Sequence, residues 1–166
     1  MRRLLFMVIV LLTFCCIPQK ELKTIEGDLY YEWLKLGNFY GQPDSVLANF
    51  KTLMDSVGYE GLMKEDSVFA VYIKLLDDND LLVAPYVYVM TDEEKKLLLY
   101  LKPEDYKSLN HFTYKELLAN NQKVRIVAKV DSLVDNRFVC KELISVDVMN
   151  GATLPQRSKF KLEDYR

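Results

Sequence analysis

The sequence is poor in the residues on which most recognisable enzyme chemistry depends. It has a single histidine, three cysteines and six glycines among its 166 residues. Histidine is the usual general acid or base near neutral pH, zinc sites need clusters of Cys and His, and phosphate loops need closely spaced glycines. The sequence contains no such cluster or loop and no G-x-S-x-G nucleophile elbow. We therefore interpret His111 as a capping or surface residue, and we expect no metal and no cofactor.

Cysteine is also too scarce to build a disulfide framework. Cys15 and Cys16 lie at the end of an apolar leader, which leaves Cys140 as the only thiol in the rest of the chain. A lone thiol has no partner for an intramolecular disulfide. Cys140 alternates with Phe138 in an apolar pattern, so we interpret it as a small buried hydrophobe.

Clusters of positive charge are missing as well. The formal net charge is −2, and it becomes more negative if Arg2 and Arg3 are removed with a leader. Nucleic-acid binding needs many phosphates to be neutralised by grouped Lys and Arg side chains. We expect no nucleic-acid partner, and no membrane attraction through a polybasic patch.

Only the start of the chain contains a long apolar run. Arg2 and Arg3 precede an apolar segment from Leu4 to Phe14. This segment is too short to cross the roughly 30 Å of hydrocarbon in a bilayer, and a basic start before a short apolar core is typical of a secretory signal. We predict a signal peptide over residues 1–15.

The end of this leader, with the sequence Leu-Leu-Thr-Phe-Cys-Cys at 11–16, resembles the lipobox of bacterial lipoproteins. In that family a cysteine at this point is acylated and becomes the mature N-terminus, and a small residue usually precedes it. The resemblance implies lipidation of Cys16, because the small Cys15 precedes it. Cys15 is the alternative, although the bulky Phe14 precedes that residue. It also implies a short tether over 16–23 and a body held at a membrane of the bacterial envelope. An ordinary cleaved signal and an uncleaved short anchor are the other interpretations.

Residues 24–166 are expected to form one α+β domain that is mainly antiparallel β. Apolar alternation and β-branched or aromatic runs predict strands at the following positions: 24–36, 67–76, 81–90, 95–101, 123–130, 138–148 and, more weakly, 159–162. The Asp-Asp-Asn-Asp sequence at 77–80 indicates a hairpin turn. Helical spacing predicts an amphipathic N-terminal helix at 44–57, and capping signals predict short helices at 103–109 and 113–119. We expect the 44–57 helix to pack on the sheet, and a partner-binding helix is the alternative.

The expected order from Ser67 onward is three strands, a helical segment and two strands. It resembles the OB-fold, a small five-stranded barrel with a helix between its third and fourth strands. An open antiparallel sheet gives the same order, so both remain open. OB barrels that bind single strands use aromatic platforms with a basic groove. The candidate ligand-binding aromatics are Tyr72, Tyr86, Tyr88 and Tyr100, and the acidic chain favours a peptide, glycan or protein ligand.

The sequence thus predicts a non-catalytic envelope lipoprotein that binds a protein, peptide or glycan, or supports an envelope assembly. The alternative is a lipid-anchored hydrolase that uses paired carboxylates. Candidate pairs are Glu104 with Asp105 and Asp77 with Asp80. The distance between the two carboxyl groups decides whether such a pair can act on a glycan.

Overall fold

The computed structural model describes residues 21–32, 37–151 and 156–157. The predicted signal peptide, both candidate lipidation sites and most of the tether lie outside these residues, as does the weak strand predicted at 159–162. Within the described ranges no helix combines the length and the apolar character needed to cross a bilayer.

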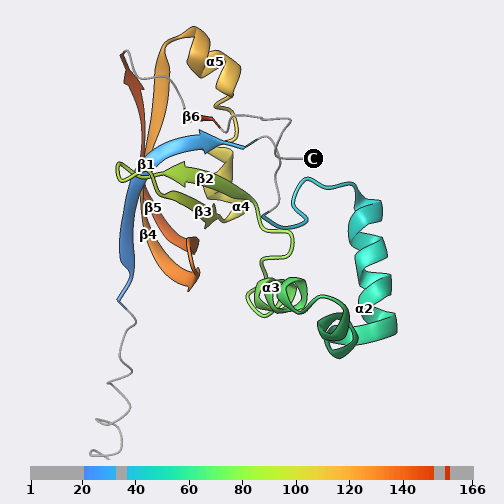
Figure 1. The fold of residues 1–166 in the computed structure, drawn as a ribbon. Helices are drawn as coiled ribbons and strands as arrows, with labels where there is room; N and C mark the ends of the chain where they lie inside the picture. The colour runs from blue at the N-terminus through green and yellow to red at the C-terminus, as the bar shows by residue number, and fades with distance from the viewer. Residues whose placement is uncertain (1–20, 33–36, 152–155, 158–166) are drawn as a thin grey trace, which may run out of the picture.

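The chain forms an α+β fold, as the sequence predicts (Figure 1). Its strands are β1 (Lys23–Tyr31), β2 (Tyr86–Met90), β3 (Lys96–Tyr100), β4 (Gln122–Val134), β5 (Arg137–Asn150) and β6 (Gln156–Arg157). Its helices are α2 (Asp44–Glu65), α3 (Ser67–Asp77), α4 (Pro103–Lys107) and α5 (Tyr114–Ala119).

The strands form one mixed sheet in the order β2-β3-β5-β4-β1-β6, with an additional pairing between β2 and β1. The pairs β1–β4, β4–β5, β2–β3 and β1–β2 are antiparallel. The pairs β3–β5 and β1–β6 are parallel. The sheet is therefore mainly antiparallel, and in its parallel pair β3–β5 the chain leaves β3 through α4, α5 and β4 before it returns.

The long β4–β5 hairpin confirms the clearest strand prediction. Val124, Ile126, Ala128 and Val130 alternate along β4, and all four are buried. Register shifts along the hairpin bend both strands, because an extra residue on one strand increases the local twist. Cys140 on β5 is buried in the same core, as expected.

The strand predicted at 67–76 is wrong, because this segment is helix α3. The Asp66 side chain caps it by accepting a hydrogen bond from Phe69 N at 2.9 Å. Ala70, Ile73 and Leu76 follow at helical spacing and are buried. Because almost every position of this segment is apolar, the helical spacing of its buried residues cannot be recognised in the sequence. Its β-branched residues therefore favoured a strand in the sequence analysis.

The hairpin predicted at 77–80 is consequently wrong as well. These residues end α3, and Leu81 N donates to Leu76 O at 2.7 Å. The next strand begins only at Tyr86, directly after Pro85. Proline has no N–H to donate to a ladder, which explains why β2 starts after it.

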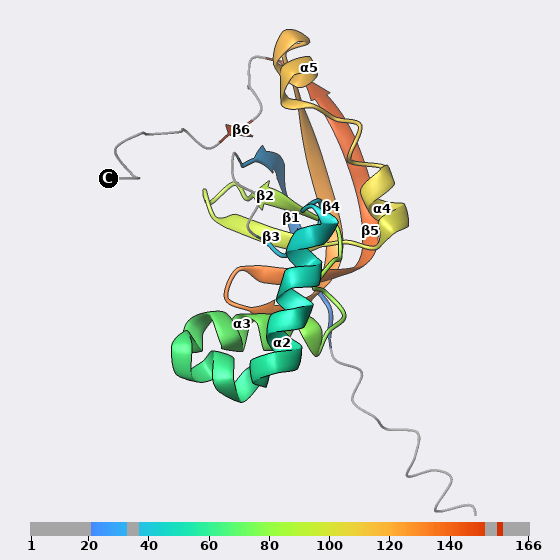
Figure 2. The ribbon, with the colours of Figure 1, turned by 90° about the vertical axis from the view of Figure 1, so that its right-hand side faces the viewer.

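Helix α2 differs from its prediction in extent and in packing. Gly58 ends its regular part at the predicted place, with φ 62 and ψ −178, and a second helical stretch continues to Glu65. The expected packing on the sheet is wrong: Leu62 is the one buried residue of α2, and Val46 and Leu53 are exposed. Figure 1 shows α3 between α2 and the sheet, and Figure 2 shows the same helices from the side of α2. Stacking of Phe50 on Phe39, with ring centroids 4.8 Å apart, also holds α2.

Strand β3 is buried on both faces, which explains its continuous apolar sequence. Leu97 and Leu99 belong to the core enclosed by β1, β4 and β5. Leu98 and Tyr100 point the other way and pack with Leu76 of α3. A strand that is buried on both faces has an almost continuous apolar sequence. Helix α3 thus covers part of the outer face of β2 and β3, and it limits which part of that face reaches solvent.

Candidate binding face on strands β2 and β3

A shallow depression of about 460 Å³ lies over the part of strands β2 and β3 that α3 leaves uncovered. Its lining comes from the end of β1, from β2 and β3, and from the β4–β5 turn. The residues that line it are Glu32, Tyr88, Lys96, Leu97, Leu98, Asp135, Asn136 and Arg137. We call this surface the β2–β3 face.

Strand register brings the central residues of the β2–β3 face side by side. Tyr88 is the Cα partner of Leu98, and Leu98 is the Cα partner of Arg137. Leu98 N donates to Asn136 O at 2.9 Å, which fixes the β4–β5 turn against β3. The neighbouring strands β2 and β3 and the more distant strand β5 therefore present one row of side chains.

Lys96 is held over aromatic rings at one side of this row. Its Nζ lies 5.4 Å from the centroid of the Tyr88 ring and 6.0 Å from that of Tyr30. The same ammonium group forms an ion pair with the Glu32 carboxylate. A cation over a ring face is attracted by the negative face of the π system. Lys96 is thus positioned while about half of its side chain stays exposed.

Arg137 occupies the other side of the row. Its guanidinium carbon lies 4.8 Å from the centroid of the Tyr72 ring, and its Nη1 lies 3.9 Å from Asp135 Oδ2. Among the described residues its Nε is buried without a hydrogen-bond partner. A planar donor fork stacked in this way suits recognition of a carboxylate or another planar acceptor.

Three of the four predicted binding aromatics converge inside the protein. Tyr100 OH donates to Gly37 O at 2.7 Å, and Tyr72 OH donates to the same oxygen. Gly37 N donates to Tyr86 OH at 3.0 Å, and the hydroxyls of Tyr72 and Tyr100 are 2.8 Å apart. This cluster fastens the segment at Gly37 and helix α3 to strands β2 and β3.

Burial separates Tyr86 and Tyr100 from any surface platform, whereas Tyr72 is half-buried and its ring lies under the Arg137 guanidinium. Tyr86 and Tyr100 are buried, and desolvation raises the pKa of both phenols above the usual value. Their hydroxyls already bind the backbone of Gly37. Tyr88 is the one predicted aromatic that lines the β2–β3 face, so ligand binding stays a prediction that rests on Tyr88.

Lys96, Arg137 and Glu32 were missed by the sequence analysis. They come from three separate segments, and no spacing along the chain relates them. The one sequence feature that could have indicated two of them is a charged residue at the start of a strand, because Lys96 begins β3 and Arg137 begins β5. Only strand pairing shows that these ends are adjacent.

The candidate carboxylate pairs of the hydrolase alternative do not line the β2–β3 face. Asp77 accepts a hydrogen bond from Tyr59 OH at 2.5 Å, and Asp80 lies in a turn with φ 58. Glu104 and Asp105 belong to the first turn of α4. The hydrolase alternative stays a prediction. Over the described part of the chain, no group of three or more His, Cys, Asp and Glu side chains could hold a metal ion.

His111 follows α4 and is exposed at the surface, as the sequence analysis expects. Its ring centroid lies 3.9 Å from that of Phe112.

Comparisons with protein-family models, with curated proteins and with solved structures find no match for this chain.

Proposed function

We propose that this protein is a non-catalytic lipoprotein of the bacterial cell envelope that binds a partner protein through the β2–β3 face. The observation that carries this proposal is the placement of two cations, Lys96 and Arg137, over tyrosine rings at the edge of one shallow depression. Tyr and Arg are enriched among the residues that contribute most to binding at protein interfaces.

The charges around the face favour a protein over a polyanion. Glu32 and Asp135 stand beside Lys96 and Arg137, so both signs alternate over a short distance. A partner with complementary charges matches this pattern, whereas a phosphate backbone would meet repulsion from the two carboxylates. A peptide or a glycan would use the same aromatic surface, and the experiment below distinguishes these ligands.

The strand pairings support an OB-like barrel as the framework of this face. Strand β1 pairs with β4 along Lys23–Asp28 and with β2 along Asp28–Tyr30, so the order β1-β2-β3-β5-β4 returns to β1. Helices α4 and α5 come between the third and fourth strands of this order, as in an OB-fold. The first strand is β1, however, and not the segment at 67–76 that the sequence analysis used.

In the proposed barrel, the β2–β3 face lies where OB-folds bind their ligands. OB-folds bind ligands on the face of their second and third strands, bordered by the loops after the first and the fourth. Here β2 and β3 are those strands. Asp135 and Asn136 form the β4–β5 turn, and Glu32 directly follows β1.

The predicted leader supports the envelope location. A short tether at 16–23 after a lipidated Cys16 would hold the body close to its membrane. Two or three acyl chains, at roughly 0.8 kcal/mol per buried CH₂, make such an anchor practically permanent. A partner would therefore be met at the membrane surface.

Charge reversal at Lys96 tests the binding proposal. The intact protein, Lys96→Glu and the control Lys115→Glu on α5 are purified from the native envelope, and co-purified proteins, peptides and glycans are quantified by mass spectrometry. We expect one protein to be recovered with the wild type and Lys115→Glu, and to be lost with Lys96→Glu. Equal recovery with all three forms would contradict the role of the face. Loss of a bound glycan or peptide instead of a protein would change the ligand class.

A further inference from the structure

Helix α3 is apolar on almost every side. Lys74 is the only charged residue from Ser67 to Leu76. One side is used by the core, where Ala70 and Ile73 are buried. On the other side Val68 is 80% exposed and Val71 is 57% exposed. A helix that is apolar all round is normally covered on all sides, so this side of α3 calls for an apolar partner.

The exposed side of α3 continues onto the β4–β5 turn. A depression of about 490 Å³ lies between them, and its lining is mainly apolar. Phe69 and Val71 of α3 line it together with Val134 of β4. Phe69 and Val134 are also exposed. We call Val68, Phe69, Val71 and Val134 the α3 patch.

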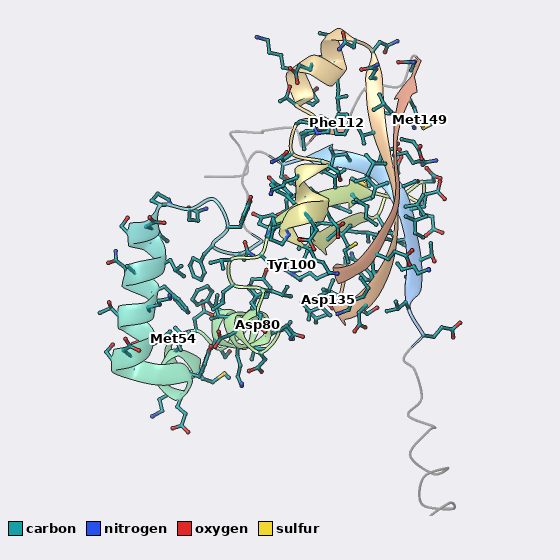
Figure 3. The ribbon with its side chains drawn as sticks, turned by 180° about the vertical axis from the view of Figure 1, so that it is seen from behind. Met54, Asp80, Tyr100, Phe112, Asp135 and Met149 are labelled. Carbon is teal, nitrogen blue, oxygen red and sulfur yellow. The ribbon has the colours of Figure 1, made fainter. Side chains whose placement is uncertain are left out.

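The α3 patch lies at the end of the molecule where β1 begins. Figures 1 and 3 both place the start of β1, the β4–β5 turn and α3 at one end, and α5 at the opposite end. Lys23, the first residue of β1, lines a second depression together with Asp135 of that turn. The chain therefore enters the body beside the same turn that borders the α3 patch.

The length of chain before β1 limits how far this end can lie from a membrane. Five peptide steps separate Cys16 from Glu21, and they span at most about 18 Å. A lipid on Cys16 would consequently hold the end that carries the α3 patch against the bilayer interface. A partner in solution would compete for this space with the membrane itself.

We propose that the α3 patch rests on the lipid surface to which the protein is anchored, and so fixes the orientation of the body. This inference rests on the lipid anchor of the proposed function. The contact is apolar in character, because Asp66 and Asp135 border the patch together with Arg137 and leave no excess of positive charge. It should therefore occur on neutral phosphatidylcholine and be insensitive to salt.

The test uses the full acylated chain in phosphatidylcholine vesicles, with an environment-sensitive NBD dye on one introduced cysteine. Val68→Cys reports on the α3 patch, and Leu118→Cys on α5 is the matched control, because Leu118 is also exposed but lies at the opposite end. The buried Cys140 is not expected to react. Val71→Cys serves if Val68→Cys fails to fold, as judged by circular dichroism.

We expect dye at position 68 to emit at shorter wavelength on vesicles and to be quenched by nitroxide-labelled lipid, with position 118 unchanged. If the chain is acylated and both positions behave alike, the inference is overturned and the proposed function stands. If no acyl mass is found, the anchor is wrong and the inference falls with it. A shift at position 68 without vesicles that grows with protein concentration would assign the patch to a second copy, and would also overturn the inference.

Discussion

Asp28 on β1 and Arg125 on β4 are register partners, and the Asp28 carboxylate accepts a hydrogen bond from Arg125 Nε at 3.0 Å. Lys123 Nζ donates to the same carboxylate at 2.9 Å. Arg125 also binds Asp92 in the turn between β2 and β3. Asp28 pairs with Met90 of β2 as well, so this buried charge network stands where β1 changes from β4 to β2 as its partner.

Replacing Asp28 with alanine should destabilise the fold strongly. The Asp28 residue is only 6% exposed, and removal of its carboxylate leaves two cations without their buried counter-charge. Breaking one partner of a buried ion pair costs about 3–5 kcal/mol of the free energy of unfolding. Urea unfolding followed by circular dichroism measures this loss. The control Glu26→Ala removes an exposed partner of Arg125 and should cost about 0–1 kcal/mol. Equal unfolding midpoints for the two variants would contradict the prediction.

Gly27→Ala should weaken the pairing of β1 with β2. An added Cβ would lie 2.5 Å from Met90 O and 2.6 Å from a methyl carbon of Val89. Both atoms belong to β2, whose backbone cannot move without breaking its bonds to β3. Overpacking of this kind costs about 1–3 kcal/mol, measured as a lower urea midpoint. An unchanged midpoint would show that β1 and β2 are further apart than described.

Alkaline pH should destabilise the protein through Cys140. Burial raises the pKa of its thiol from 9.0 to about 11. Between these values the unfolded chain loses the thiol proton while the folded protein keeps it, so the free energy of unfolding falls as pH rises. Cys140→Ala should remove this slope between about pH 9 and pH 10, as measured by urea titrations. Above about pH 10 the buried tyrosines Tyr86 and Tyr100 add a similar loss, because their phenols ionise there in the unfolded chain while burial raises their pKa in the folded protein. A slope identical in wild type and Cys140→Ala would exclude this origin.

Fatty-acid labelling in a bacterial host should depend on Cys16. The wild-type chain is expected to incorporate labelled palmitate, and Cys16→Ser is expected not to, because serine has no thiol to acylate. Labelling that persists in Cys16→Ser and disappears in Cys15→Ser would move the site by one residue. A wild-type protein without label would end the lipoprotein proposal.

Local signals predicted several elements correctly. The alternation along β4 gave its buried face, since a strand with one buried side repeats every two residues. Thr113 and Glu116 predicted the start of α5, where Glu116 N donates to Thr113 Oγ1 at 3.3 Å. Gly58 marked the break in α2 because it takes a positive φ. These features depend on residues a few positions apart.

The sequence by itself determined the short apolar run at 4–14, the scarcity of residue types common in catalysis, the α+β class and the faces of the regular strands. Only the tertiary structure decided that 67–76 is a helix, that α2 stands away from the sheet, and that Lys96 and Arg137 share one surface. The reason is physical: composition and local periodicity act over one or two turns of chain. Strand pairing joins segments dozens of residues apart, and it leaves no mark in the spacing of the residues that it brings together.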